Sequence, residues 1–294
     1  MSNPTDDAPA PDPQPPRQFP VLPFVVSRGG PAYALGVAAF GGLLAALVFG
    51  VVVAFVRSMF WIVMVFPLLH GVLVGAGVGL PARLTKCRYQ MGLALVGALC
   101  GVLSYVVVHY VFFLAFVGAG NGPPIGFWEY MDLKATEGVR FGKAGAGGAG
   151  NGIGYTGSII YWVFEAIITA AGAAALASVC VGSPFCEGCN RWKQKRQLGP
   201  YRVEPGYSVP AVASGLPTGL LVPADGKKSV VVALYVCPAC GDQGTLDVKL
   251  TGTHQDGRKM LTWNGFVTYP GEALQTFDEV ERACRELGLG GKKK

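Results

Sequence analysis

The chain has 294 residues, of which 51% are hydrophobic and only 14% are charged, and its formal net charge is +6. Soluble domains contain about 25% charged residues, so this composition excludes an ordinary soluble protein. The 43 glycines form no Gly-x-y repeat, which excludes collagen. Glycine and alanine instead concentrate in apolar runs, as in closely packed membrane helices.

We expect residues 1–30 to form a disordered, proline-rich tail in the cytosol. Residues 1–23 contain eight prolines and three aspartates. No basic segment precedes a short apolar run, so the pattern does not match a secretory signal peptide. The composition favours a disordered or polyproline-like chain, and a proline-rich ligand for a partner domain is the less favoured alternative.

Four apolar stretches follow within residues 31–182, each long enough to cross a bilayer, which takes about 20 residues. They run roughly over 33–56, 60–80, 91–117 and 156–181. One such stretch could be a buried core helix, but four together predict an α-helical bundle of four transmembrane helices. Gly71-x-x-x-Gly75 and Gly97-x-x-x-Gly101 would allow close helix approach, although this motif is common.

Basic residues near the membrane predict that both termini are cytoplasmic. The loop at 83–88 contains three basic residues and the segment at 191–196 contains four. The opposite side has Arg57 and a long loop in which acids balance bases. The positive-inside rule places the more basic side in the cytoplasm. We interpret the 191–196 cluster as a contact to anionic lipid, and nucleic acid is the disfavoured partner.

The outer loop, about 119–155, contains an aromatic stretch at 127–133 that predicts a short interfacial helix. The glycine-rich run at 142–154 is superficially similar to a phosphate-binding loop. It lacks the Gly-Lys-Ser/Thr ending, and no strand precedes it. We therefore reject nucleotide binding and expect a flexible hinge.

Three ionisable residues, Glu165, His109 and His70, fall within the apolar stretches at similar depth. A carboxylate at that depth is costly unless it is protonated or bonded to a partner. Two interpretations remain open. The cluster is either a set of hydrogen bonds that lock the bundle, in which case Glu165→Gln should be tolerated, or a proton relay or small polar ligand pocket.

Two Cys-x-x-Cys motifs, with Cys186 and Cys189 in the first and Cys237 and Cys240 in the second, have the spacing of zinc knuckles. Two intervening residues let one turn bring both sulfurs to one tetrahedral ion. We expect Gly188 and Gly241 to relieve the strain of these turns. Thiol–disulfide exchange is disfavoured because neither pair opens a helix in a βαβ unit. Four thiolates therefore predict one structural zinc ion.

The surroundings of the knuckles predict a small, β-rich α+β domain over residues 183–287, followed by a basic tail at 288–294. Strands are expected at 229–236, 245–251 and 260–268, where apolar or alternating runs occur. An amphipathic helix is expected at 274–287. Zinc should contribute to the folding of this loop-rich segment.

The second knuckle, Cys-Pro-x-Cys-Gly, resembles the half-site of zinc ribbons, and this resemblance implies Cys186, Cys189, Cys237 and Cys240 as the ligands. The 47 residues between the knuckles exceed the roughly 15–20 of compact sites. With Gly126-Phe-Trp-Glu-Tyr130 and Tyr161-Trp-Val-Phe-Glu165, the whole pattern resembles multi-pass bacterial membrane proteins that have a cytosolic zinc-ribbon tail. That resemblance implies the bacterial inner membrane and brings no activity with it.

We therefore expect a membrane-anchored structural or interaction protein whose cytosolic zinc-ribbon domain docks a protein partner. No nucleophile–base pair or open metal site is visible, so we do not expect an enzyme. The alternative is a small transporter or proton-coupled channel that uses Glu165, His109 and His70. The identity of the partner and the formation of homo-oligomers stay open.

Overall fold

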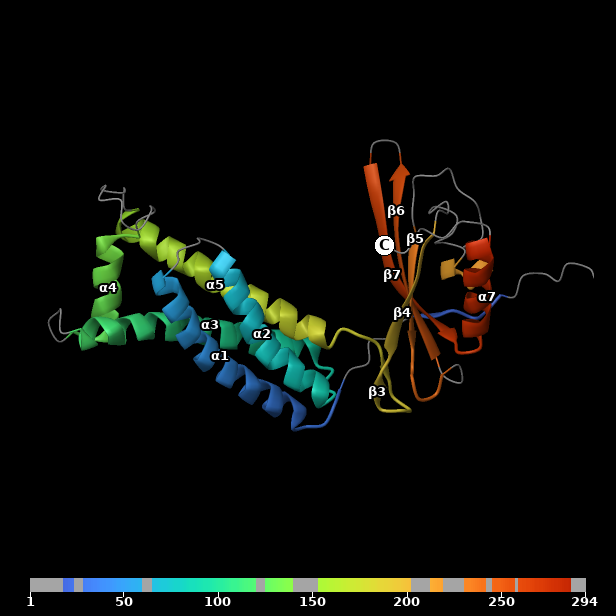
Figure 1. Ribbon diagram of the computed structural model, residues 1–294, viewed down its shortest axis with the longest axis horizontal. Helices are drawn as coiled ribbons and strands as arrows, with labels where there is room; N and C mark the ends of the chain where they lie inside the picture. The colour runs from blue at the N-terminus through green and yellow to red at the C-terminus, as the bar shows by residue number, and fades with distance from the viewer. Residues whose placement is uncertain are drawn as a thin grey trace, which may run out of the picture. The chain divides into compact units, whose positions relative to one another are not determined.

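The computed structural model describes residues 18–23, 29–59, 65–119, 125–139, 153–201, 212–218, 230–241, 245–256 and 259–286. The chain forms two compact units (Figure 1). The helical unit spans Arg28–Ser183, and the sheet unit combines Met1–Ser27 with Pro184–Lys294. The sheet unit is thus built from both ends of the chain, and the helical unit is inserted between them in sequence.

The described residues of the helical unit form four helices that are long and apolar enough to cross a membrane. They are α1 (Ala34–Met59), α2 (Val65–Leu84), α3 (Gln90–Gly118) and α5 (Gly154–Cys180). Large apolar side chains such as Phe40, Phe55 and Met91 are exposed on them. Four helices in the expected places confirm the number of apolar elements, and α2 continues to Leu84, beyond the expected end near residue 80.

Small residues allow the helices of this bundle to pack closely. A Cβ atom added to Gly75 of α2 would lie 2.5 Å from the carbonyl oxygen of Ala173 in α5. One added to Gly97 of α3 would lie 2.8 Å from the same oxygen. Helix α5 therefore packs its backbone against both α2 and α3, as the spaced glycines indicate.

A short helix, α4 (Phe127–Glu137), follows α3 in the position where the aromatic stretch predicts one. Glu129 caps its first turn, because its carboxylate accepts a hydrogen bond of 2.8 Å from the backbone N–H of Gly126. The rings of Phe113 and Tyr130 lie 5.6 Å apart and join α4 to α3. Residues 142–152, most of the glycine-rich run, lie outside the described residues, and so does the hinge expected there.

The sheet unit is built around a five-stranded antiparallel sheet with the strand order β1-β7-β6-β5-β4. Its strands are β1 (Leu22–Pro23), β4 (Gln194–Tyr201), β5 (Val230–Val236), β6 (Thr245–Asp256) and β7 (Lys259–Pro270). A separate hairpin pairs β2 (Phe185–Cys186) with β3 (Arg191–Trp192). The three expected strands and the final helix, α7 (Ala273–Glu286), are all present.

The core of the sheet unit lies between the sheet and α7. Phe277 and Val280 of α7 pack with inward side chains of three adjacent strands, including Leu234, Leu246 and Tyr269. The rings of Tyr269 and Phe277 meet edge to face at 5.4 Å. Burial of these large apolar side chains is the main stabilising term for the unit.

Residues 18–23 belong to this unit, although the sequence places them in a disordered tail. Leu22 pairs with Thr268, and Pro23 with Val267. Phe19 is 8% exposed and contacts the ring of Tyr269 at 6.4 Å. Its backbone N–H donates to the carbonyl oxygen of Gly215 at 2.9 Å. The expectation of disorder is therefore wrong for residues 18–23, because contacts with residues distant in the sequence order this proline-containing segment.

Candidate metal centre and a polar cluster between the helices

The two knuckles occupy equivalent turns. Cys186 ends β2 and Cys189 lies in the turn before β3, while Cys237 follows β5 and forms an isolated bridge with Gly241. The residue after the second cysteine has a left-handed backbone in both, with φ of 52° at Asn190 and 54° at Gly241. The expectation for Gly241 holds, but the first knuckle uses Asn190 rather than Gly188. Asparagine tolerates this conformation better than most residues.

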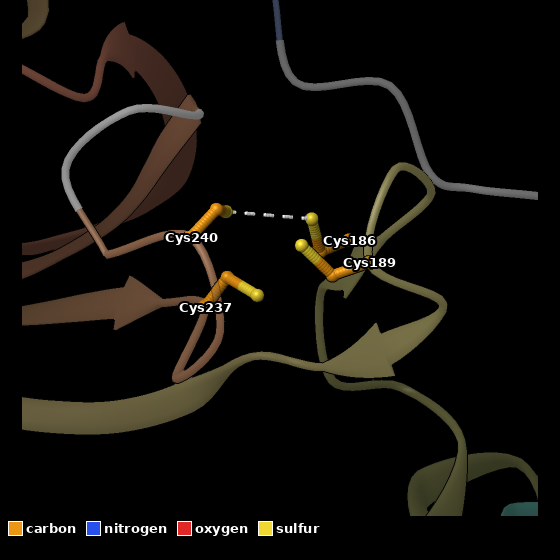
Figure 2. Close-up of side chains that lie close together, drawn as sticks. All are labelled: Cys186, Cys189, Cys237 and Cys240. Carbon is orange, nitrogen blue, oxygen red and sulfur yellow. Dashed lines mark hydrogen bonds between the residues drawn. The ribbon is translucent and has the colours of Figure 1, made fainter.

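The four cysteine sulfurs converge on one point, with all four within 4.8 Å of one another (Figure 2). The Sγ atoms of Cys186 and Cys240 are 3.9 Å apart. A disulfide would require about 2.05 Å. Tetrahedral zinc with Zn–S bonds of about 2.3 Å requires sulfurs about 3.8 Å apart. The spacing therefore fits a metal ion held by four thiolates, with two ligands from each knuckle.

The second knuckle is prepared to hold negative charge. Burial raises the pKa of Cys237, but hydrogen bonds from the backbone N–H groups of Cys240 and Ala239 and from neighbouring thiols outweigh it and lower the pKa to about 6. The pKa of Cys240 is raised to about 12, chiefly because its thiol is hydrogen-bonded to Cys237 and then because of burial. A divalent cation would replace the shared protons and leave every sulfur a thiolate.

A buried ion pair lies in the same unit, close in sequence to the first knuckle. Lys193 Nζ lies 2.6 Å from Asp247 Oδ2 and donates to the carbonyl oxygen of Thr245 at 2.7 Å. Thr268 donates to the other Asp247 oxygen at 2.7 Å. The backbone N–H of Lys193 donates to the carbonyl oxygen of Pro184 at 3.0 Å. These bonds tie the β2–β3 hairpin to β6 and β7, and so help to hold the two knuckles together.

This geometry changes the interpretation of the basic cluster at 191–196. Lys193 is 5% exposed and neutralised by Asp247, so it does not face lipid. Arg196 pairs with Asp278 at 2.6 Å and Glu281 at 2.7 Å, which fastens β4 to α7. Arg191 and Lys195 are exposed. Two of the four cations thus serve the fold of the sheet unit.

Glu165 is held between three helices by one arginine and two tyrosines. Arg57 Nη2 of α1 donates to its two carboxylate oxygens at 2.9 and 3.0 Å. Tyr105 of α3 donates at 3.0 Å, and Tyr161, one turn earlier in α5, donates at 2.7 Å. Glu165 is 4% exposed. The carboxylate is therefore ion-paired and hydrogen-bonded inside the helical unit.

His70 is held by a second set of hydrogen bonds. His70 Nε2 and Ser104 Oγ are 2.6 Å apart, and Ser104 donates to the carbonyl oxygen of Ala46 at 2.8 Å. Because Ser104 has one hydroxyl proton and donates it to Ala46, its oxygen must accept the hydrogen bond from His70 Nε2. This chain joins α2, α3 and α1. Glu165 and His70, two members of the expected Glu165–His109–His70 cluster, thus have different hydrogen-bond partners.

His109 belongs to neither set. Its ring packs edge to face against Tyr105 at 4.7 Å and Trp162 at 5.5 Å. Its Nε2 atom is buried and has no hydrogen-bond partner among the described residues.

Arg57 was the partner missed for Glu165, because a lone cation after an apolar stretch is normally a loop residue. An acidic residue in an apolar stretch indicated that Glu165 needs a polar partner, but not that Arg57 is that partner.

Comparisons with models of protein families, with curated proteins and with solved structures gave no match. The class of protein therefore follows from its own geometry. It combines four helices able to span a membrane with a small sheet unit whose four clustered cysteines could bind a metal ion.

Proposed function

We propose that this chain is a membrane-anchored, non-enzymatic zinc protein whose zinc-ribbon-like domain docks a cytosolic protein partner. The convergence of four cysteine sulfurs carries this proposal. Four thiolates complete the tetrahedral shell of zinc and leave no position for water or substrate, so the ion would be structural. A domain that uses a closed metal site for stability presents its surface for binding.

The sheet also supports the proposed topology. Strand β1 precedes the first apolar helix and β7 follows the last one, yet they pair in one sheet. Strands that pair this way lie on one side of a membrane, as four crossings require. The basic loop at 83–88 favours the cytoplasm for that side. A reducing compartment would also keep the four thiols available for metal. The proposed location is the bacterial inner membrane.

Site-specific photo-crosslinking in native membranes tests this function. A photoreactive residue at Lys195, which is exposed on β4, should capture a defined cytosolic protein. The same residue at Phe40, 63% exposed on α1, is the matched control and should capture lipid or membrane proteins. Cys237→Ser should abolish capture by the probe at position 195 and leave capture by the probe at position 40 unchanged. Capture that is indifferent to Cys237→Ser would contradict a zinc-dependent docking domain.

The alternative is a small transporter or proton-coupled channel that uses Glu165, His109 and His70. The saturated hydrogen bonding of Glu165 supports a locking role for this residue instead. The two proposals differ in reconstituted vesicles. Ion or proton flux that Glu165→Gln abolishes without loss of folded protein would establish the alternative and displace the docking proposal.

A further inference from the structure

The helical unit contains a pocket of about 590 Å³ beside α4. Its lining includes Arg57, His109, Tyr130, Lys134, Glu137 and Trp162. These residues come from α1, α3, α4 and α5. The volume lies within the usual range for small-molecule sites, and aromatic and apolar walls with a few polar groups are typical of them.

An unsatisfied buried nitrogen points to a ligand in this pocket. His109 lines it and is 9% exposed, and its Nε2 atom has no hydrogen-bond partner in the described part of the chain. Buried polar atoms are nearly always hydrogen-bonded, so an orphan needs an explanation. A ligand that occupies the pocket can supply the missing partner.

The charges around the pocket select the kind of ligand. Arg57 lines the pocket whereas its carboxylate partner Glu165 does not, so the ion pair presents its cation to this space. Lys134 adds a second cation. Glu137 is the one acid among the described residues that line the pocket, and it already contacts Lys134 at 2.6 Å. Hydrogen-bond donors therefore predominate, which favours an anionic oxygen group.

We propose that this pocket binds a phosphate group, carried either by a lipid headgroup or by a soluble phosphate. Arg57, Lys134 and the His109 imidazole supply donors from three helices. Trp162 and Tyr130 form aromatic walls of the kind common in the headgroup zone of membranes. The remaining volume accommodates the alcohol part of a headgroup. This site is independent of the zinc-dependent docking function.

Histidine NMR tests the site directly, because the chain contains 3 histidines. The full-length protein, labelled with ¹⁵N-histidine in a phosphate-free maltoside detergent, should give three imidazole spin systems. The signals that disappear in His109→Gln belong to His109. Inorganic phosphate and short-chain phosphatidylglycerol are then titrated separately, with His70 and His254 as internal references.

Saturable shifts of the His109 signals with both probes would identify a soluble phosphate as a sufficient ligand. Shifts with phosphatidylglycerol alone would identify the lipid headgroup. Lys134→Ala should weaken either response about tenfold or more, since it removes a charge-assisted contact. Lys195→Ala, an exposed lysine of the sheet unit, is the matched control and should change nothing. No saturable shift at His109, or equal affinity in Lys134→Ala and wild type with unchanged melting, overturns the proposal.

Discussion

Arg57 and Glu165 lie 108 residues apart in the chain, yet one guanidinium nitrogen of Arg57 contacts both oxygens of the Glu165 carboxylate. The pair joins the end of α1 to the middle of α5. Each charge is largely buried, with side-chain exposures of 16% and 6%. The ion pair offsets the cost of burying a carboxylate, because Arg57 supplies the opposite charge and two tyrosines donate hydrogen bonds.

Breaking this ion pair should destabilise the helical unit. Glu165→Leu removes the carboxylate that faces a largely buried guanidinium, at a cost of about 3–5 kcal/mol. Glu165→Gln should also be harmful, contrary to the tolerance expected for a purely hydrogen-bonded cluster. The double variant Arg57→Met/Glu165→Leu should recover most of the loss. Unfolding of the purified protein in detergent measures this, and Glu137→Gln, at an exposed acid, is the control. Equal stability of Glu165→Leu and wild type would contradict the pair's structural role.

The metal centre predicts one zinc ion per chain. Cys237→Ser removes one of the four ligands and should abolish tight zinc binding. Because zinc binding is coupled to folding, the sheet unit should also lose stability. A loss of a few kcal/mol would lower its melting temperature by roughly 10 °C or more. Elemental analysis and thermal melting check both effects. Cys180→Ser, outside the cluster, should retain full metal content, and retention of zinc by Cys237→Ser would refute the ligand set.

The N-terminal segment should stabilise the distant sheet. Phe19→Ala removes a ring packed against Tyr269 and should cost about 3 kcal/mol. Pro20→Ala changes an exposed neighbour and should have little effect. Melting of the sheet unit and proteolysis near β7 measure the difference. Removal of residues 1–23 without any loss of stability would show that β1 is dispensable.

Close packing of α2 on α5 should depend on Gly75. A larger side chain there would collide with the backbone of Ala173, so Gly75→Leu should separate the helices and cost about 1–3 kcal/mol. Gly36→Leu is the matched control, because nothing lies within 4 Å of a Cβ at that position. Monodispersity and thermal stability in detergent report the outcome. Equal behaviour of the two variants would argue against this packing.

The proposed topology predicts which side each segment faces. Alkaline phosphatase, which is active only outside the cytoplasm, should be active when fused after residue 119. It should be inactive when fused after residue 86 or residue 294. Fluorescent protein fusions should give the reverse pattern, since β1, which precedes the first apolar helix, and β7, which follows the last one, belong to one sheet. Phosphatase activity at residue 294 would reverse the proposed topology.

Local patterns in the sequence were sufficient for the repeating elements. Long, mainly apolar runs predicted α1, α2, α3 and α5, because a helix that crosses a membrane must be predominantly apolar over about 20 residues. Two-residue spacing between thiols predicted the knuckles, since that turn alone sets the distance between paired sulfurs. Alternating residues predicted β6 and β7.

Long-range partners needed the tertiary structure. Neither the composition of residues 18–23 nor their periodicity indicates that they complete a sheet formed about 245 residues later. In the sequence, Lys193 and Arg57 are ordinary basic residues beside apolar segments. In the structure each forms a buried ion pair, Lys193 with Asp247 and Arg57 with Glu165. Local sequence determines which backbone conformation is favourable and which face is apolar. The partner of a charge or an edge strand depends on how the whole chain closes on itself, and that closure brings together groups far apart in sequence.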